Sequence, residues 1–396
     1  MAYFRLNSYL FSSLIGNMEF HSFFCPSIQT VMIITEIQIY RLSIPMEPFV
    51  IATGTMDYAQ NTFIKIITDT EHYGVGECSA FPMIVGETQN TCLAIAQDFA
   101  EIWKGKDALA LEERLAELHL YIAGNATIKS AFDMALYDLA AKAAGLPLYQ
   151  YLGGKKKDIV TDITLGIASP EEMAQKALKL KDGGAFALKV KLGKKPHDDI
   201  ARIRSIRQAV GFDIPIRIDA NQGWSYEGAI EALQGLEAYK IQFCEQPMRT
   251  YNDHLLSELR TQTIVPIMAD ESVYTHHDAE RLCKTDACDY INIKFSKSSG
   301  IHEALKIQAV AAEYNIPCMI GGMLESRLAL AAKVHFAYAS SNVKFYDLDT
   351  CMVGHLEDPV VGGVQYNGYE IQISDEIGIG ADIKQEFLDK CEKWVI

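Results

Sequence analysis

Residues 188–193 read LKVKLG, a short apolar run with charged side chains at its end. Similar runs follow as IRIDAN (216–221), FCEQP (243–247), IMADES (267–272), INIKFS (291–296) and FYDLDT (345–350). With an uncharged run that ends at Ile320, successive run ends from Lys191 onward are 24 to 28 residues apart. One strand and one helix fill such a repeat, and an earlier strand at 162–165 makes eight units. The series therefore predicts a (β/α)8 barrel of the TIM type.

The segments on either side of the barrel have other patterns. Alternating apolar residues predict antiparallel strands from Met32 to about Gly76, and a helical pattern follows from Thr88 to Gly145. We therefore expect an α/β protein in which an N-terminal α+β capping domain precedes the barrel and the C-terminal segment returns to complete it. The expected parts are an extension, disordered or wrongly annotated, at 1–31, the cap at 32–157, the barrel at 158–350 and the returning segment at 351–396.

The composition is that of an acidic globular protein. Among 396 residues, 51 Asp and Glu against 36 Lys and Arg give a net charge of −15, which disfavours nucleic acid and anionic membranes as partners. The sequence contains no run of 18 apolar residues, so we expect no segment that spans a membrane. Nine cysteines without a CxxC pair indicate a reducing, cytoplasmic compartment rather than a disulfide framework or zinc site. The sequence leaves open whether the protein forms a homo-oligomer.

Three consecutive strands of the predicted barrel end in acids, which are Asp219, Glu245 and Asp270. The carboxyl ends of barrel strands meet at one face, where active sites form. Each acid alone could be the N-cap of the next helix, but three in register make a cluster of hard oxygen ligands without thiolate or imidazole. The cluster predicts one Mg²⁺ per subunit.

Lysines are expected beside this cluster. Lys189 and Lys191 are two residues apart on one strand, so their side chains point to the same side. Their proximity to each other and to a metal ion is expected to lower their pKa, which leaves one lysine able to act as a base near neutral pH. Lys294 lies four strands further round an eight-strand ring, opposite Lys191. The alternative is that its side chain extends to the surface. A substrate between them would present one face to each lysine.

From Met32 to its end, the chain resembles the enolase superfamily, in the subgroup of muconate-lactonizing enzymes. The resemblance rests on Lys189-Val190-Lys191, the three acids and Lys294, which match the superfamily pattern in type and order on five strands. It implies that Mg²⁺ binds a substrate carboxylate and stabilises the ene-diolate formed when a lysine removes the α-proton. Lys191 and Lys294 on opposite faces then imply a racemase or epimerase that works by two-base 1,1-proton transfer.

Asp347 and Asp349 lie on one side of the eighth strand, at a distance from the metal acids. Beside an apolar or anionic substrate they would lack a compensating charge, so we expect a substrate cation unless they pair with local lysines such as Lys344. The motif resembles the DxD of dipeptide epimerases, which implies that it binds the free α-ammonium group while the C-terminal carboxylate binds Mg²⁺. The same resemblance implies further substrate contacts at Lys189, Thr164, Gly322 and Met323.

The segment Glu47–Asp57 (EPFVIATGTMD) is expected to close over the substrate side chains. Epimerases of Ala-Glu resemble it but have an Arg at the position of Gly54, and without that cation an acidic side chain gains nothing. The segment offers neutral walls instead, at Phe49, Val50, Ile51 and Met56. Small neutral dipeptides such as Ala-Ala, of the D-Ala/L-Ala type, are therefore the expected substrates, with Ala-Glu as the alternative.

Other activities fit these residues less well. Cycloisomerases and o-succinylbenzoate synthases of the same subgroup act on substrates without an ammonium group, so the DxD argues against them. Acid-sugar dehydratases would need a His base on the seventh strand, where Met319-Ile320-Gly321 supplies none. A catalytically silent barrel that binds an anion at Gly321-Gly322 would not need three lysines and three metal acids.

Overall fold

Eight parallel strands form the centre of the computed structural model, which describes residues 31–396. Each strand is hydrogen-bonded to the next in chain order. The Asp162 amide donates to the Tyr346 carbonyl at 3.1 Å, so the last strand lies against the start of the first. The predicted barrel is thus confirmed and nearly closed. Its strands are β4 (Ile163–Leu165), β5 (Leu188–Lys191), β6 (Ile216–Asp219), β7 (Ile241–Glu245), β8 (Ile267–Ala269), β9 (Tyr290–Ile293), β10 (Cys318–Gly321) and β11 (Val343–Asp347).

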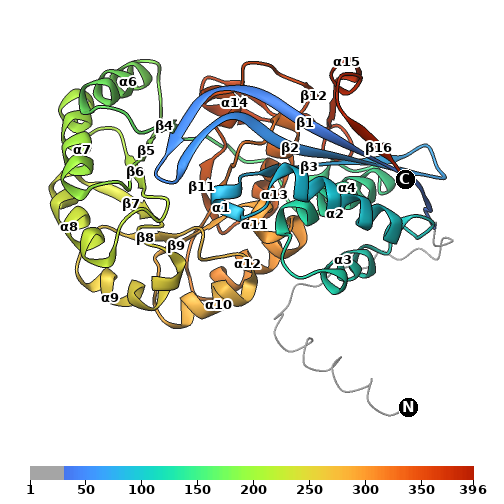
Figure 1. Cartoon of the computed structure of the whole chain (residues 1–396), viewed down its shortest axis with the longest axis horizontal. Helices are drawn as coiled ribbons and strands as arrows, with labels where there is room; N and C mark the ends of the chain where they lie inside the picture. The colour runs from blue at the N-terminus through green and yellow to red at the C-terminus, as the bar shows by residue number, and fades with distance from the viewer. Residues whose placement is uncertain (1–30) are drawn as a thin grey trace, which may run out of the picture. The chain divides into compact units, whose positions relative to one another are not determined.

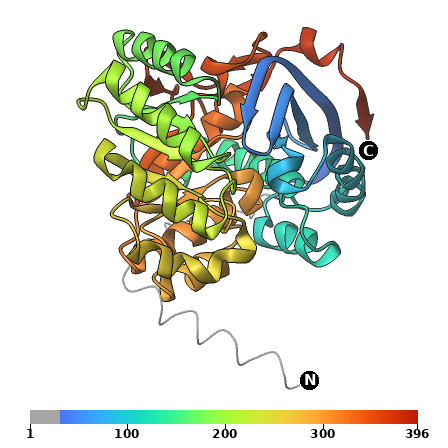
Figure 2. The ribbon, with the colours of Figure 1, turned by 60° about the vertical axis from the view of Figure 1, so that its left-hand side comes forward.

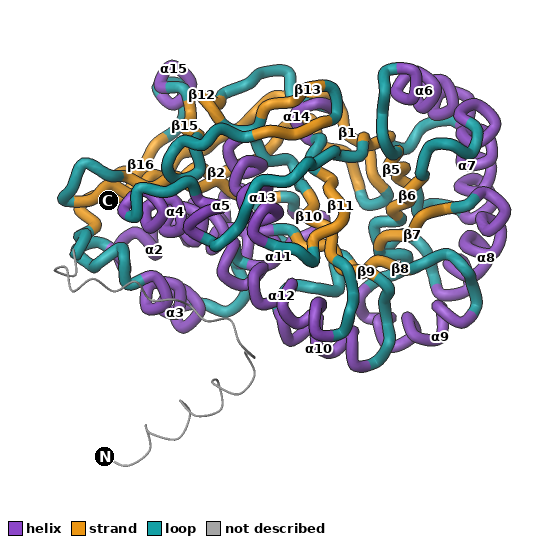
Figure 3. Tube along the Cα trace, turned by 180° about the vertical axis from the view of Figure 1, so that it is seen from behind, coloured by secondary structure: helices purple, strands orange, loops and turns teal. Residues whose placement is uncertain are grey.

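Helices cover the outside of the barrel and connect its strands (Figure 3). Two of them begin at capping boxes, in which Ser169 and Thr275 each exchange hydrogen bonds with the residue three positions on. These crossovers keep the strands parallel, so the charged ends of the apolar runs all meet at one face. The helices are α6 (Pro170–Asp182), α7 (Pro196–Val210), α8 (Tyr226–Leu236), α9 (Leu256–Thr261), α10 (His276–Lys284), α12 (Ile301–Glu313) and α13 (Arg327–Ala339).

The N-terminal cap contains a four-stranded antiparallel sheet in the order β16-β1-β2-β3. Its edge strand β16 comes from the C-terminus, where Gln38 pairs with Val395 and Tyr40 with Lys393. Figure 2 shows this end of the chain beside the N-terminal strands. Three helices occupy the region from Thr88 to Gly145 for which a helical pattern was expected. The elements are β1 (Ile34–Ile51), β2 (Gly54–Thr68), β3 (Tyr73–Ala80), β16 (Lys393–Val395), α2 (Gln89–Trp103), α3 (Leu111–Tyr121) and α4 (Ala126–Ala143).

Short elements complete the described part. They are α1 (Pro82–Val85), α5 (Leu148–Tyr151), α11 (Phe295–Ser298), α14 (Thr350–Val353), α15 (Gln385–Leu388), β12 (Val360–Gly362), β13 (Gln365–Asn367), β14 (Glu370–Gln372), β15 (Ala381–Ile383) and 3₁₀ turns at Glu237–Tyr239 and Thr250–Leu255. Within residues 31–396, no helix combines the length and the apolar character needed to cross a membrane. The expected extension at 1–31 falls, except for Val31, outside the described residues.

Helix α4 joins the cap to the barrel. Strand β3 packs directly on it, because a Cβ atom at Gly76 would lie only 1.9 Å from the Ala131 carbonyl oxygen. On the other side, the Asp133 carboxylate accepts hydrogen bonds from the Ile301 and His302 amides at 2.5 and 3.2 Å, and so caps α12. The helix therefore fixes the capping sheet relative to the barrel helices.

Strands β1 and β2 extend beyond the capping sheet as a hairpin over the carboxyl face of the barrel (Figure 1). At the base of the hairpin, the Glu47 amide donates to the Gly354 carbonyl at 2.8 Å. Near its tip, the Val50 carbonyl accepts from the Ile167 amide at 3.3 Å. The hairpin is therefore attached at both points to segments that follow barrel strands, and it closes over the strand ends.

Candidate active site

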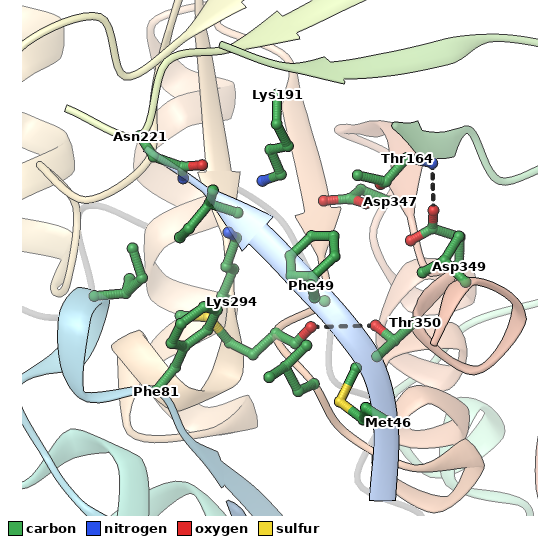
Figure 4. Close-up of a pocket in the computed structure, with 16 residues that line it drawn as sticks. Met46, Phe49, Phe81, Thr164, Lys191, Asn221, Lys294, Asp347, Asp349 and Thr350 are labelled. Atoms are coloured by element: carbon green, nitrogen blue, oxygen red, sulfur yellow. Dashed lines mark hydrogen bonds between the residues drawn. The ribbon is translucent and has the colours of Figure 1, made fainter. Parts of the chain in front are cut away.

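A cavity lies between the carboxyl face of the barrel and the β1–β2 hairpin (Figure 4). Among the residues predicted for the site, those that line it are Thr164, Lys191, Lys294, Gly322, Met323, Asp347 and Asp349. Apolar side chains make up most of the remaining wall, at Met46, Phe49, Ile51, Phe81, Ile84, Leu324 and Val353. The predicted polar groups thus share one enclosure with a set of apolar side chains.

The three predicted metal ligands come together below this cavity. One carboxylate oxygen from each of Asp219, Glu245 and Asp270 lies within 4.8 Å of the other two, and all three residues are fully buried. Glu245 Oε2 and both carboxylate oxygens of Asp270 accept no well-aligned hydrogen bond, although a lysine ammonium group lies 2.5 to 2.8 Å from each of them. Buried carboxylates with unused lone pairs are a donor set that suits a hard divalent cation. These residues therefore fit Mg²⁺.

The pKa values of two of these acids shift in opposite directions. Burial raises the pKa of Glu245 well above its usual value, and the Asp219 charge adds to the effect. Burial also acts on Asp270, but the ammonium groups of Lys294 and Lys297 outweigh it and hold the pKa of that carboxyl well below its usual value. A divalent cation would stabilise the ionised form of the whole cluster.

Lys189 lies at the centre of the buried charges. Its Nζ is 3.3 Å from Asp219 Oδ2, 2.8 Å from Glu245 Oε2 and 2.7 Å from Asp347 Oδ2. Burial lowers the pKa of this ammonium group, but the three carboxylates outweigh burial and raise the pKa well above its usual value. The expectation that Lys189 and Lys191 depress each other's pKa is therefore wrong for Lys189, because it is surrounded by carboxylates.

Lys191 and Lys294 reach the same cavity from opposite sides of the barrel (Figure 4). Strand β5, which ends at Lys191, and strand β9, which precedes Lys294, are four strands apart in the eight-stranded sheet. The Lys191 Nζ is 2.6 Å from Asp219 Oδ2, and the Lys294 Nζ is 2.8 Å from Asp270 Oδ2. A molecule bound above the carboxylate cluster would therefore have a lysine near each of two faces.

Asp347 already has a cationic partner inside the barrel. Its Oδ2 atom accepts a hydrogen bond from Lys189 Nζ at 2.7 Å. Lys344, the local lysine considered as its partner, is exposed on β11. The expectation that Asp347 lacks a compensating charge is therefore wrong, because Lys189 reaches it from β5.

Asp349 differs from Asp347 in having no lysine or arginine partner among residues 31–396. Its Oδ2 atom accepts from the Thr164 amide at 2.6 Å. Burial, followed by the charges of Asp347 and Asp162, raises the pKa of Asp349 to about 8. Asp162 itself pairs with Arg217 at 2.8 Å. Asp349 is thus the acid of the DxD motif that an added cation would stabilise most.

Gly54 does not line the cavity. It lies at the hairpin tip, where it pairs with Ile51, and a Cβ atom there would be 2.0 Å from Met83 Sδ. Phe49 and Ile51 line the cavity as expected. The other two expected wall residues are outside its lining, namely Val50 and Met56. Any side chain at position 54 would therefore have to displace Met83.

Three polar residues of the site carry no mark of their own in the sequence, although each lies within three positions of a predicted ligand or base. Asn221 Oδ1 and Glu271 Oε2 are buried without a hydrogen-bond partner. Burial, with the charges of Asp270 and Asp219, raises the pKa of Glu271 to about 7. Lys297 is fully buried, and its Nζ is 2.5 Å from Asp270 Oδ1. These residues extend the polar surroundings of the carboxylate cluster.

Two protein-family models match the chain. The model for the mandelate racemase / muconate lactonizing enzyme N-terminal domain covers residues 34–153, and the enolase C-terminal domain-like model covers residues 172–387. The two matches together cover both the cap and the barrel.

Individual relatives match over nearly their whole length. The D-Ala-D/L-Ala epimerase of Cytophaga hutchinsonii is 43% identical over 365 residues, 91% of this chain and 99% of that protein. The L-Ala-D/L-Glu epimerase of Clostridium acetobutylicum is 40% identical over 355 residues, 89% of this chain and 99% of that protein. The crystal structure of a dipeptide epimerase from C. hutchinsonii, complexed with Mg and the dipeptide D-Ala-L-Val, has a TM-score of 0.91 at 43% identity. The match covers 92% of this chain and 100% of that one.

We expect Mg²⁺ to bind at the carboxylate cluster and to raise the melting temperature of the protein. A ligand present at a hundred times its Kd stabilises the folded state by about 2.7 kcal/mol. Glu245→Gln removes one charged ligand and should abolish most of the increase. Calorimetric melting curves of chelator-treated protein, with and without added Mg²⁺, measure the effect.

The second acidic cluster provides the matched control. Asp162, Asp347 and Asp349 also have one oxygen each within 4.8 Å of the others, but the pKa of Asp349 is raised to about 8, so this carboxyl is mostly protonated near neutral pH and is a poor metal ligand. Asp349→Asn should therefore keep the Mg²⁺-dependent increase. Loss of the increase in this variant, or its persistence in Glu245→Gln, would contradict the assignment.

Proposed function

The chain belongs to the mandelate racemase / muconate lactonizing enzyme family of the enolase superfamily, and we propose that it is a Mg²⁺-dependent dipeptide epimerase. In this proposal it inverts the α-carbon of the C-terminal residue by two-base proton transfer. The observation that carries the proposal is one cavity with Lys191 and Lys294 on opposite sides and the Asp347-Asp349 pair beside them. The two epimerase relatives that span this chain support it.

Lys191 and Lys294 serve the two faces of the α-carbon. One lysine in its neutral form accepts the α-proton, and the other, protonated, donates a proton to the opposite face. Asp219 and Asp270, at 2.6 and 2.8 Å, hold the two ammonium groups on their respective sides. Mg²⁺ at the three acids supplies positive charge to the substrate carboxylate, whose negative charge grows as the α-proton leaves. Repeated transfer in both directions interconverts the two configurations.

The DxD motif binds the α-ammonium group of the dipeptide. Asp347 shares its charge with Lys189, whereas Asp349 has a pKa of about 8 and is mostly protonated near neutral pH. An ammonium group beside Asp349 favours its ionised form. Binding of the substrate therefore releases the proton of Asp349 and puts the ammonium group in its place.

The apolar part of the lining favours dipeptides with neutral side chains. Phe49 and Ile51 from the hairpin and Leu324 from the barrel face the cavity, and its cationic side chains are the two proposed bases. An acidic side chain would find no further cation among these lining residues. Small neutral dipeptides such as Ala-Ala are therefore the proposed substrates. Ala-Glu is the second candidate, and the L-Ala-D/L-Glu epimerase relative is what favours it.

A cytoplasmic location completes the proposal. The eight cysteines in residues 31–396 are all free thiols, and six of them are buried. This part of the chain therefore uses no disulfide for its stability, as is usual for proteins of reducing compartments.

The central prediction concerns exchange of the α-proton with solvent. In D₂O, the Mg²⁺-loaded enzyme should introduce deuterium at the C-terminal α-carbon of Ala-Ala and invert it, as mass spectrometry and chiral chromatography will detect. Lys191→Ala and Lys294→Ala should each reduce inversion by about 10²- to 10⁴-fold, because one face loses its acid or base. Either variant can still exchange the isomer that faces its remaining lysine.

Lys344→Ala is the control for this experiment, because Lys344 is an exposed lysine of another barrel strand, β11. It should invert Ala-Ala at the wild-type rate. Inversion at that rate by Lys294→Ala would contradict the two-face arrangement, and absence of exchange in the wild type with every dipeptide tested would contradict the proposed function.

A second prediction tests the ammonium site. N-acetylation of the dipeptide removes the cation opposite Asp349, which should cost about 2 to 5 kcal/mol, or roughly thirtyfold to several thousandfold in kcat/KM. In Asp349→Asn the difference between the free and the acetylated dipeptide should shrink. Equal kcat/KM values for the two substrates in the wild type would show that the DxD motif does not bind an ammonium group.

A third prediction tests the side-chain preference. Gly54→Arg combined with Met83→Ala should raise kcat/KM for Ala-Glu relative to Ala-Ala by roughly ten- to a hundredfold, through a charge-assisted contact of about 1.5 to 3 kcal/mol. Met83→Ala makes room for the new side chain and is by itself the control. A wild-type ratio that strongly favours Ala-Glu would overturn the substrate assignment but not the metal and lysine assignments.

A further inference from the structure

A buried ion pair lies directly behind the wall of the cavity that Gly322 and Met323 form. Lys333 on α13 is 0% exposed and Glu325 in the loop after β10 is 1% exposed. Lys333 Nζ is 2.5 Å from Glu325 Oε1. Neither residue belongs to the carboxylate cluster, the proposed bases or the DxD motif. Because the removal of two charges from water is costly, the pair points to a role that apolar side chains would not fill.

Both members of the pair hold the backbone of the cavity wall. Lys333 Nζ donates to the Gly321 carbonyl at 2.9 Å, and Glu325 Oε2 accepts from the Met323 amide at 2.6 Å. The pair thus forms hydrogen bonds to the backbone on both sides of Gly322. Hydrogen bonds to charged partners are stronger and more directional than the packing of apolar side chains. Lys333 and Glu325 therefore hold the backbone of residues 321–323 on the side away from the cavity.

The capping sheet holds the other end of this loop. Asn61 Nδ2 on β2 donates to the Leu324 carbonyl at 3.1 Å and to Glu77 Oε1 at 2.6 Å. Glu77 on β3 also accepts from the Ser326 amide at 2.9 Å, at the N-terminus of α13. A carboxylate is favoured there because the first amides of a helix have no partner within it. Residues 321–326 are thus held at both ends.

We propose that Glu325, buried in a pair with Lys333, is a positioning residue that fixes the depth of the cavity wall at Met323 and thereby limits the size of the dipeptide side chains. This inference rests on the proposed function and assigns one determinant of its substrate range. A small side chain fits in front of the wall. A large one has to move Met323 backwards and break its hydrogen bond to Glu325. The facing hairpin contributes Phe49 and Ile51, so the side chains are confined from both directions.

Two double variants separate positioning from simple filling of space. Lys333→Met/Glu325→Met replaces the pair by apolar side chains of similar volume, an exchange that often preserves stability. It leaves the Met323 amide without its acceptor. Lys333→Met/Glu325→Gln also removes both charges but keeps a side-chain carbonyl that can accept from the Met323 amide. Both variants lose the Lys333 hydrogen bond to the Gly321 carbonyl, so they differ only in whether the Met323 amide keeps an acceptor at position 325.

The first measurement is the ratio of kcat/KM for Ala-Ala to that for Ala-Leu. We expect the Met/Met variant to lower this ratio at least tenfold relative to the wild type, because the wall can retreat for the larger side chain. The Met/Gln variant should stay within threefold of the wild type. Unchanged ratios in both variants, or equal decreases in both, would overturn the positioning role.

The second measurement needs no substrate. Hydrogen–deuterium exchange with fragmentation that isolates the Met323 amide should show at least tenfold faster exchange in the Met/Met variant and near wild-type exchange in the Met/Gln variant. If the amide responds in this way but the wild type acts on no dipeptide, the proposed function is wrong, while the conclusion that Glu325 fixes the backbone at Met323 remains. If the wild type is active and the amide exchanges equally in all three proteins, the positioning role is wrong.

Discussion

The ammonium group of Lys189 joins the two acidic halves of the barrel mouth. It contacts Asp219 and Glu245 on one side and Asp347 on the other, at 2.7 to 3.3 Å. Carboxylates buried this close to one another cannot all ionise unless cations lie between them. The strands that supply these acids, β6, β7 and β11, approach a single point only because the barrel is nearly closed. The charge balance of the site and the closure of the fold therefore depend on each other.

The sequence was informative where chemistry and spacing coincide. Repeats of 24 to 28 residues with a charge at most ends predict both the barrel and the face at which the charges meet. Strand periodicity also shows that Lys189 and Lys191 share a side. It does not show which of them is surrounded by acids from other strands, and for that reason the expected pKa of Lys189 was wrong. Partners across a barrel come from closure, which no local pattern encodes.

Residues that act from behind the cavity were the least predictable. Lys333 lies in the helical segment RLALAAKVHFAYA, where a single lysine normally indicates the solvent face. Helix α13 is instead buried over nearly all of its surface, because α5, strand β3 of the cap and strands β12 and β15 of the C-terminal segment also pack on it. Gly54 illustrates the converse case. Its position in the closing segment was foreseen, but its contact with Met83 depends on how the hairpin meets α1.

Strand β1 lacks its partner β16 during most of the synthesis of the chain, because the two strands are far apart in the sequence. Gln38 leaves the ribosome 357 residues before its partner Val395. At ordinary rates of synthesis the edge of β1 waits on the order of tens of seconds for its partner. An open strand edge is a template for pairing with other chains. The three residues of β16 therefore close this edge only late in synthesis, and their loss would leave the edge of β1 open to other chains.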